Sequence, residues 1–311
     1  MSGEPPARHQ SPHRPAAHRA PWKAGDRRWG LVLVAPQLIG TLVFVIVPLI
    51  GGLALSFTDW DGLSQAHLVG LANFATELTD PLFLRAVLNT LGIAVITIPV
   101  GLGIAVVLAV ALHELRFRSV YLVMIVAPVV TSSVAVAMIW QQLLRADGPI
   151  STILADVLRI APPEWLSDPR LALVAVCAVI IWSSLGLNVL IFLAGLQSID
   201  PTVLEAARVD GAGALASFFR IRMPLLSPTI FFSVVVAAIS SLQTFDSVYI
   251  LTKNGGPDNA TRTIVLHVYD LGFHRFQFGV SSAAALLLLV LTLAVTLAQF
   301  GAQRRFVYYE S

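Results

Sequence analysis

The chain has 311 residues, of which 56% are apolar and 12% are charged, and its formal net charge is +2 at pH 7. Soluble domains contain about 25% charged residues, so this chain lacks the charged surface that a water-soluble fold needs. The small net charge gives no indication of a nucleic-acid partner, and the single cysteine, Cys177, excludes an intrachain disulfide. The composition is that of an integral membrane protein.

The N-terminal segment differs from the rest of the chain. Residues 1–28 are rich in Pro, His, Arg and Ala and show no helical periodicity. Such a segment cannot bury a core, so we expect it to be a disordered tail. Residues 29–305 contain all of the long apolar runs and are predicted to form one membrane domain. Residues 306–311 are predicted to be a short C-terminal tail.

Long apolar runs recur along the membrane domain. A helix that spans the bilayer needs about 20 mostly apolar residues. Backbone groups in lipid must be paired within the segment, so such runs are helices, and the short alternating segments of a β-barrel are absent from this sequence. The predicted fold class is therefore all-α, with six transmembrane helices. The six runs are 30–57, 86–112, 119–143, 171–195, 226–250 and 279–302.

The positive charges predict the orientation, because Lys and Arg are more frequent in cytoplasmic segments. With the N-terminal tail inside, thirteen of the 20 Lys and Arg residues lie on that side. Both termini are therefore predicted in the cytoplasm, together with the segments 113–118 and 196–225. The segments 58–85, 144–170 and 251–278 are predicted outside.

Helices 171–195 and 226–250 carry polar side chains at membrane depth, where such groups are costly and usually face a cavity or another helix. Hydroxyl and amide groups can hydrogen-bond the hydroxyls of a sugar, and an indole can stack on its ring. The alternative is that these groups bond their own helix backbone or a neighbouring helix. The candidates for a solute cavity are Trp182, Asn188, Ser241 and Gln243.

The sequence contains no constellation of catalytic residues. It has no GxxxxGK[ST] phosphate loop, so it is not expected to bind ATP in that way. It also has no paired His/Cys cluster that would suggest a metal, and a satisfied or solvated side chain is expected for both His267 and His274. We therefore expect no catalytic residue, metal or cofactor in this chain.

A polar stretch at 197–225 separates the fourth run from the fifth. Asp200 can cap a helix, and Pro201 suits its first turn. The Asp-Gly pair at 210–211 ends that helix, and a second short helix, "ALASFFRIR", follows up to Pro224. Physical reasoning leaves two interpretations open: a connector that rests on lipid headgroups through its arginines, or a docking site for a soluble partner.

The spacing within this stretch resembles the EAA motif of ABC importer permeases. That motif is Glu-Ala-Ala, three residues, Gly, nine residues, Ile, one residue, a large apolar residue and Pro. In that family the loop is a coupling helix that sits in a groove of a cytoplasmic ATPase. The resemblance therefore implies that the coupling residues of this chain are Glu205, Ala206, Ala207, Asp210, Gly211, Ile221 and Pro224.

Other stretches resemble the sugar-transporting members of that family. They include "FTDWDGL" at 57–63, "LVGLANFATELTDPLFLRAVLNT" at 68–90 and "FDSVYILTKNGGPDNAT" at 245–261. Their order is similar to that of the first permease of maltose-type or glycerol-phosphate-type importers, and the resemblance covers roughly residues 30–305.

The resemblance implies a multi-pass subunit of a bacterial cytoplasmic membrane that moves a sugar or polyol across the lipid bilayer. It implies three protein partners: a second, similar permease, a cytoplasmic ATPase dimer, and an extracytoplasmic solute-binding protein. ATP hydrolysis would then take place on the partner ATPase, and this chain would not be an enzyme.

Three other functions are alternatives to this one. An ABC permease for an amino acid or peptide is the nearest alternative, opposed by the "WDG" and "NGGP" stretches. A secondary transporter should show paired internal repeats and buried ion-coupling acids, and neither is evident. A membrane-embedded enzyme would need a cluster of His, Asp or Glu at membrane depth, which the sequence lacks.

Overall fold

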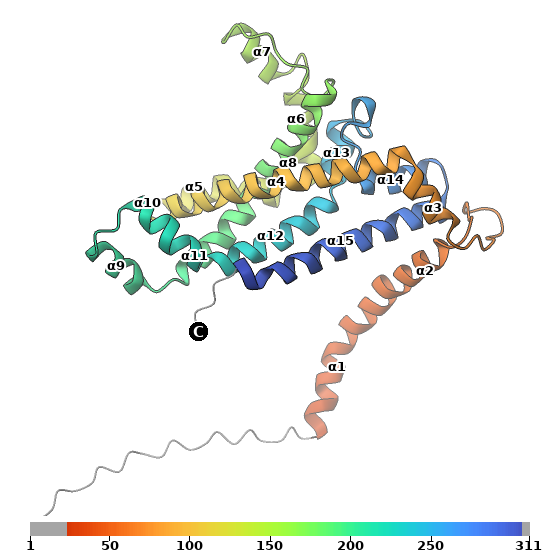
Figure 1. The fold of residues 1–311 in the computed structure, drawn as a ribbon, viewed down its shortest axis with the longest axis horizontal. Coiled ribbons are helices and arrows are strands. Elements are labelled where there is room, and N and C mark those ends of the chain that lie inside the picture. Colours follow the sequence, from red (N-terminus) through yellow and green to blue (C-terminus); the bar gives the residue numbers. More distant parts are fainter. Residues whose placement is uncertain (1–23, 307–311) are drawn as a thin grey trace, which may run out of the picture. The chain divides into compact units, whose positions relative to one another are not determined.

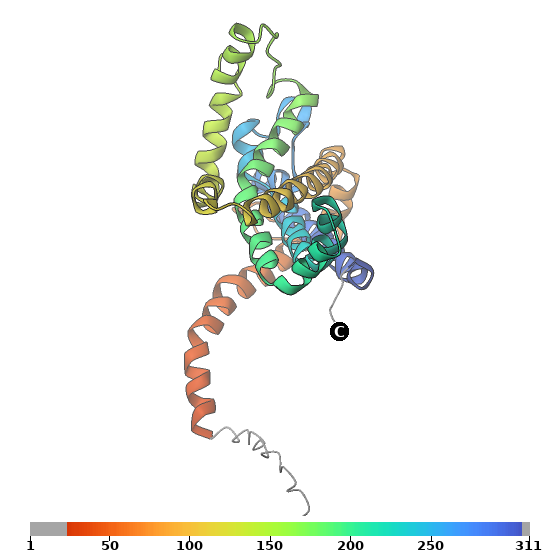
Figure 2. The same ribbon diagram turned by 90° about the vertical axis from the view of Figure 1, so that its left-hand side faces the viewer.

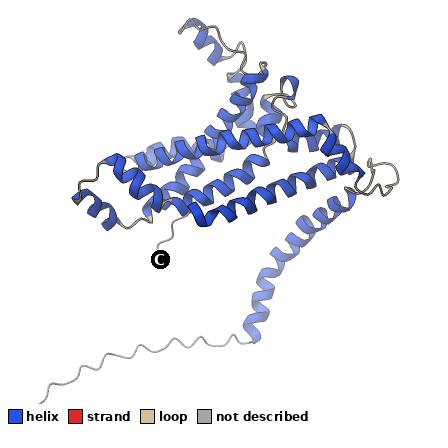
Figure 3. Ribbon diagram, in the orientation of Figure 1, coloured by secondary structure: helices blue, strands red, loops and turns tan. Residues whose placement is uncertain are grey.

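The computed structural model describes residues 24–306 and the side chains of residues 31–304. Throughout this part of the chain the regular structure is helical, apart from an isolated β-bridge between Thr58 and Leu68 (Figure 3). Four helices are long and apolar enough to cross a membrane, or up to six if each of two bent pairs is one span. The predicted all-α membrane fold is confirmed at this level.

The chain divides into two units, residues 1–51 and 52–311. The described part of the first unit consists of α1 (Ala24–Thr41), the π-helical turn η1 (Leu42–Ile46) and the start of α2 (Val47–Leu55). Most of the predicted tail lies outside the described residues. Its last five residues are helical, because Ala and Arg are strong helix formers and continue directly into the apolar run.

Apolar side chains of the first unit are exposed along its length. The exposed fractions of Leu33 and Phe44 are 79% and 80%. Water would oppose such exposure, whereas lipid does not, so this surface agrees with the predicted span at 30–57.

The second unit is built on two helices that begin in the same way. α4 (Pro81–His113) and α8 (Pro169–Gln197) pack along one another (Figure 1). Asp80 and Asp168 precede the two helices, and their carboxylates accept hydrogen bonds of 2.9 and 2.7 Å from first-turn amides. The Pro that follows each Asp occupies a position where no amide hydrogen is needed.

An apolar cluster joins the C-terminal halves of α4 and α8 to the start of α12 (Ser227–Leu242). Small side chains such as Ala105 and Ala109, both fully buried, allow the helices to approach closely. The cluster consists of Leu102, Ala105, Val106, Ala109, Leu112, Val189, Phe192, Leu193, Leu196 and Leu226.

The predicted single helix at 119–143 is wrong, because this segment forms two helices. α5 (Arg118–Val130) and α6 (Ser133–Leu143) meet at an angle of 99°, a bend that is visible in Figure 2. Near the bend, Pro128 lacks an amide hydrogen and cannot donate the helical hydrogen bond to the carbonyl four residues back. The hydroxyl of Thr131 donates a 2.9 Å hydrogen bond to the carbonyl four residues back, which the helix would otherwise use.

The predicted single helix at 226–250 is also wrong. α12 ends at Leu242, and after a break of three residues the chain forms α13 (Asp246–Leu251). The break leaves the carbonyl of Thr244 outside a helix, and the hydroxyl of Thr263 donates to it at 3.0 Å. A break at this depth is possible because protein groups pair the freed backbone.

The remaining elements lie at the two ends of the bundle that α4, α8, α12 and α15 (Phe278–Phe306) form. Figure 1 shows α9, α10 and α11 at one end and α3 and α14 at the other. Their bounds are α3 (Ala72–Thr79), α7 (Pro149–Asp156), α9 (Pro201–Val209), α10 (Ala214–Ser217), η2 (Phe218–Arg222), α11 (Met223–Leu225), η3 (Pro257–Asn259), α14 (Ile264–Tyr269) and η4 (Asp270–His274).

Candidate functional site

The segment 201–224 has the helix–turn–helix form that the sequence predicts. The Asp200 carboxylate accepts a 2.9 Å hydrogen bond from the amide of Thr202, and its hydrogen bonds to that residue hold the pKa of Asp200 below its usual value. α9 ends at Val209, and Gly211 follows with a left-handed φ of +77°. The amides of Gly211 and Ala212 donate to the carbonyls of Arg208 and Ala207 at 3.1 and 2.9 Å, which is the Schellman pattern of a helix end.

The second helical stretch is longer than predicted and less regular. It begins at Ala214, continues through the π-helical turn η2 and ends at Leu225, where it bends by 67° into α12. Pro224 cannot donate to the carbonyl four residues back, and its ring would clash there. The wider π-helical turn just before Pro224 relieves that clash.

α9 presents both charged and apolar groups to the surface. Glu205, Asp210 and Gly211 are exposed, and beside them the exposed fractions of Val209 and Leu215 are 88% and 75%. A surface with exposed apolar side chains and both signs of charge suits contact with another protein. Of the other predicted coupling residues, Ala206 and Pro224 are exposed, Ile221 is half-buried and Ala207 is buried.

The second helical stretch is attached to the bundle. Phe218 and Met223 pack against the apolar cluster at the C-terminal ends of α4 and α8. Nη2 of Arg222 donates a 2.6 Å hydrogen bond to Oε1 of Glu114, the residue that ends α4. In the sequence, Arg222 is predicted only as a cytoplasmic charge, because nothing there pairs it with a residue 108 positions away.

A cavity of about 120 Å³, lined by apolar side chains and six polar ones, lies between α4, α8 and α12. Asn188 and Ser241, two of the predicted solute-binding residues, both line it. The hydroxyls of Ser241 and Thr97 are 3.2 Å apart, and the amide nitrogen of Asn188 donates to the carbonyl of Ser184 at 3.1 Å. The polar residues that line the cavity are Thr97, Ser184, Asn188, Ser240, Ser241 and Thr244.

The other two predicted residues lie elsewhere. Trp182 packs edge-on against Trp140 with ring centroids 5.4 Å apart, beside a separate cavity of about 220 Å³ at the bend between α5 and α6. Gln243 is exposed in the break after α12. Thr97 was missed because a single Thr in an apolar run is expected to bond its own helix, and it does donate to the carbonyl of Ile93 at 2.8 Å.

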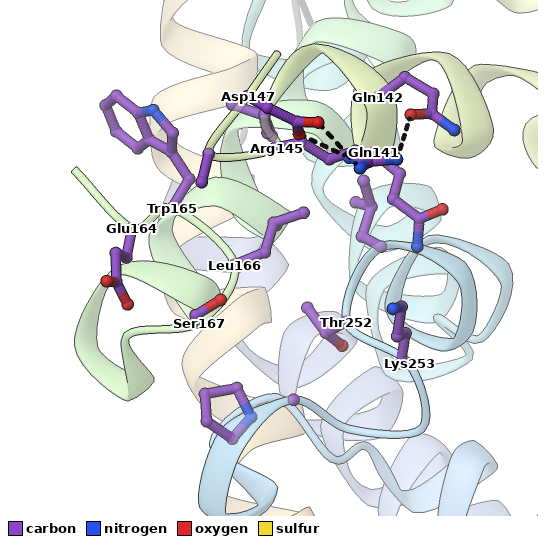
Figure 4. A pocket seen from close by; sticks show the side chains of 15 residues that line it. Gln141, Gln142, Arg145, Asp147, Glu164, Trp165, Leu166, Ser167, Thr252 and Lys253 are labelled. Carbon is purple, nitrogen blue, oxygen red and sulfur yellow. Dashed lines mark hydrogen bonds and ion pairs between the residues drawn. The ribbon is translucent and has the colours of Figure 1, made fainter. Parts of the chain in front are cut away.

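A larger cavity, of about 770 Å³, lies beyond the N-terminal end of α8. Residues 141–147 and 251–257 form one side of it and residues 164–167 the other, as Figure 4 shows. We call it the outer pocket. The 29 residues of α8 rise 1.5 Å each, so about 43 Å separate the outer pocket from the segment 201–224. If α8 spans the membrane, the pocket and the segment lie on opposite faces of that membrane.

The outer pocket is lined by hydrogen-bonding and charged groups of both signs. Arg145 pairs with Asp147 through two hydrogen bonds of 2.9 and 3.0 Å, and the hydrogen bond from Arg145 keeps the pKa of Asp147 below its usual value. Among the residues that the structure describes, Glu164 and Lys253 have no side-chain partner and so remain available to a binding partner.

A buried polar network lies at the same end of the bundle. His267 is fully buried, and its Nε2 lies 2.9 Å from a carboxylate oxygen of Glu77, which is itself 1% exposed. Nε of Arg262 donates to Nδ1 of His267 at 3.3 Å. The proton of the neutral ring must therefore sit on Nε2, where it is donated to Glu77. The prediction that His267 is a satisfied histidine is confirmed.

The same network contains a group of residues that could hold a metal ion. The ligand atoms of Glu77, Asp80 and His267 lie within 4.8 Å of one another. A metal would need the lone pair of Nε2, whereas the hydrogen bond from Arg262 to Nδ1 puts a proton on Nε2. The geometry therefore fits a hydrogen-bonded network that joins α3 to α14.

Comparison with known proteins identifies the family. Residues 97–308 match the family model described as binding-protein-dependent transport system inner membrane component. The probable ABC transporter permease protein YesP of Bacillus subtilis is 35% identical over 290 residues, which cover 92% of this chain and 94% of that protein. The lactose transport system permease protein LacF of Rhizobium radiobacter is 34% identical, with 88% and 94% covered.

Two further proteins are similar over the same length. The sn-glycerol-3-phosphate transport system permease protein UgpA of Agrobacterium fabrum is 36% identical, with 89% of this chain and 95% of that protein covered. A chain in the crystal structure of a bacterial alginate ABC transporter, in complex with its alginate pentasaccharide-bound periplasmic protein, matches the fold with a TM-score of 0.79. It is 24% identical, with 92% of this chain and 97% of that chain covered. The chain belongs to the family of binding-protein-dependent transport system inner membrane components.

Proposed function

We propose that this chain is the membrane-spanning subunit of an ATP-driven importer for a carbohydrate or related polyol in a bacterial cytoplasmic membrane. The bent pair α5–α6 counts as one span and α12 with α13 as another, which gives six transmembrane helices. Both termini and the segment 201–224 face the cytoplasm, and the outer pocket faces the opposite side. The substrate class is supported by the relatives, which are named for lactose and sn-glycerol-3-phosphate transport.

The observation that carries the proposal is the exposed segment 201–224. Its spacing is that of the EAA motif, and Glu205 and Asp210 are exposed on it together with Val209 and Leu215. This mixed surface, with the EAA spacing, supports a contact with a cytoplasmic ATPase dimer that hydrolyses ATP for the transporter.

Each part of the segment has a role in this proposal. Glu205 and Asp210 anchor it to the ATPase, the exposed Ala206 lets the ATPase approach closely, the buried Ala207 lets α9 pack closely within the chain, and Gly211 permits the left-handed turn. Closure of the ATPase would pull on α9, and the turn would pass that pull to the second helical stretch. The residues Ile221 and Pro224 hold that stretch at its bend into α12.

The cavity between α4, α8 and α12 is the proposed solute site. Its volume of about 120 Å³ is below the 300–1,000 Å³ of typical ligand pockets, so this chain supplies one part of a larger site and a second permease supplies the rest. Asn188 and Ser241 would hydrogen-bond hydroxyl groups of the solute. Contact of Trp182 and Gln243 with the solute stays a prediction, since neither lines this cavity.

The outer pocket is the proposed contact for an extracytoplasmic solute-binding protein. It lies at the opposite end of α8 from the coupling segment, and its unpaired Glu164 and Lys253 offer one charge of each sign. A binding protein that docks there would release its solute toward the cavity between the two permeases.

Reversing the charge of Glu205 tests the coupling role. The transporter would be expressed with the Glu205→Lys substitution, and two quantities would be measured: copurification of the ATPase, and uptake of labelled mono- and disaccharides. We expect both quantities to fall, because a lysine would place a positive charge in the ATPase groove that the carboxylate of Glu205 occupies. As a control, Asp156→Lys reverses an exposed charge on α7 and should change neither. Unchanged uptake with Glu205→Lys would contradict the proposal.

A further inference from the structure

Arg222 is a buried cation at the end of the coupling segment. Its side chain is 10% exposed, and its Nη2 donates to Oε1 of Glu114 at 2.6 Å. Its Nε is also buried, and it has no hydrogen-bond partner among the described residues. Burying a guanidinium with an unmet donor is costly, and an apolar side chain of similar volume would fill the place more favourably. Stability alone therefore does not account for an arginine here.

The partner of Arg222 connects two parts of the chain that are otherwise separate. Glu114 ends α4 and begins the 113–118 loop, whereas the chain after Arg222 leads through a bend into α12. Without the ion pair, the segment 201–224 would be tied by charge to neither α4 nor α5. α4 carries Thr97, which lines the solute cavity together with Ser241 of α12.

The surrounding contacts explain what the ion pair adds. Phe218 and Met223, on either side of Arg222, pack against the apolar cluster of α4 and α8. Apolar packing is not directional, so those contacts would allow the coupling segment to slide over the helix ends. A short charge-assisted hydrogen bond fixes both distance and direction. Arg222 also lies in the π-helical turn η2, and such turns are frequent at functional sites.

We propose that Arg222 is a positioning residue of the coupling step: its ion pair with Glu114 passes displacement of the segment 201–224 to α4. α4 and α12 would then move together around the solute cavity. This inference rests on the proposed coupling function, and it assigns to Arg222 a transmitting role, distinct from the docking role of Glu205.

The test measures movement at the cavity without requiring a known solute. Thr97→Cys in a Cys177→Ser background provides a single thiol at the cavity, and N-ethylmaleimide reports its accessibility. The complete transporter, with both permeases and the ATPase, would be labelled with and without ATP. The ratio of the two labelling rates measures how strongly ATP moves the cavity, and copurification of the ATPase measures docking.

We expect Glu114→Gln to bring the ratio of the two labelling rates at least about fivefold closer to one, since fivefold is the lower limit of typical coupling between two sites. Copurification of the ATPase should be unchanged. The carboxylate of Glu114 is 59% exposed, so this substitution leaves the fold intact. Arg222→Gln should have the same effect, and the double variant should show no larger one, because both remove a single interaction. Arg116→Gln, which changes an exposed cation of the same loop, should leave the ratio unchanged.

Three outcomes would overturn the inference. A ratio unchanged by Glu114→Gln shows that the ion pair transmits nothing. Additive effects of the two substitutions show that the residues act independently. Loss of the ATPase from the Glu114→Gln complex shows a docking role instead. Failure of the proposed function is recognised separately. In that case the transporter with Thr97→Cys and Cys177→Ser alone would already show no copurifying ATPase and no ATP-dependent labelling.

Discussion

Asp270 shows how single residues hold the outer end of the bundle together. Its carboxylate lies 2.7 Å from Arg262, 3.0 Å from Arg275 and 3.2 Å from His274. Partial burial disfavours its charge, yet the hydrogen bonds and charges of these three residues outweigh burial and lower the pKa of Asp270. Arg262 also donates to His267, so Asp270 supports the whole buried network.

The lowered pKa predicts how stability depends on pH. A carboxyl group with a folded-state pKa below its unfolded value of about 3.9 stabilises the fold above that value, and the contribution is lost as pH falls through the folded pKa. The thermal midpoint in detergent should therefore decrease as pH falls below about 4, and Asp270→Asn should flatten this slope. Asp156→Asn, at an exposed site, should keep it. Equal slopes for Asp270→Asn and the unchanged protein would contradict the prediction.

At the scale of elements, the contact between α5 and α8 depends on a glycine. A Cβ atom at Gly186 would lie 2.4 Å from the carbonyl oxygen of Ile125 and 2.8 Å from a methyl group of Val129. Both atoms belong to α5, and one of them is backbone, so the helix itself would have to move. Gly186 therefore sets the distance between the two helices.

Gly186→Ala should destabilise the protein by about 1–3 kcal/mol, the usual cost of overpacking. A thermal or chemical unfolding series in one detergent measures this cost. Gly103→Ala is the matched control, since a Cβ at this position of α4 meets nothing within 4 Å in the chain, and it should stabilise the protein by up to about 1 kcal/mol, the gain of Ala over Gly inside a helix. Equal stability of the two variants would show that α5 can move away freely.

The elements also show what the sequence could predict. Four of the six apolar runs became uninterrupted long helices within a few residues of the expected bounds, because length and hydropathy decide a membrane helix. The breaks at Thr131 and Thr244 were not predictable. Both depend on hydroxyl groups that pair freed carbonyls, and in the second case the hydroxyl comes from Thr263, nineteen residues away.

The candidate sites were predictable to different degrees. α9 and the left-handed turn at Gly211 that follows it depend on local rules of helix capping, so both could be predicted from the sequence. The cavity was only half predictable. The polar residues Asn188 and Ser241 both line it, but Trp182 packs against Trp140 of α6 instead. Which side of a buried helix faces which neighbour depends on tertiary packing, and a helix that is apolar all round carries no such signal.

At the scale of the whole molecule, the outer pocket and the coupling segment lie at opposite ends of α8. An importer that responds to a loaded binding protein outside by hydrolysing ATP inside needs a contact at each end. α8 also lines the solute cavity midway, through Ser184 and Asn188. One rigid helix therefore runs past all three proposed sites.

The charge of Lys253 tests the outer contact. ATPase activity of the complete transporter would be measured as the concentration of loaded binding protein is raised. Lys253→Glu should raise the concentration that gives half-maximal stimulation by about three- to tenfold, since charges at the edge of an interface act mainly on the association rate. The basal rate should stay unchanged, because the coupling segment lies at the other end of α8.

Salt dependence supplies the control for that measurement. Stimulation of the unchanged transporter should weaken as ionic strength rises, because exposed charges are screened over about 10 Å at 0.1 M salt. Lys253→Gln removes one charge without adding a repulsion, so it should raise the half-maximal concentration less than Lys253→Glu and should also reduce the salt dependence. If all three proteins give the same curve at every salt concentration, Lys253 does not face the binding protein, and the docking surface must lie outside the outer pocket.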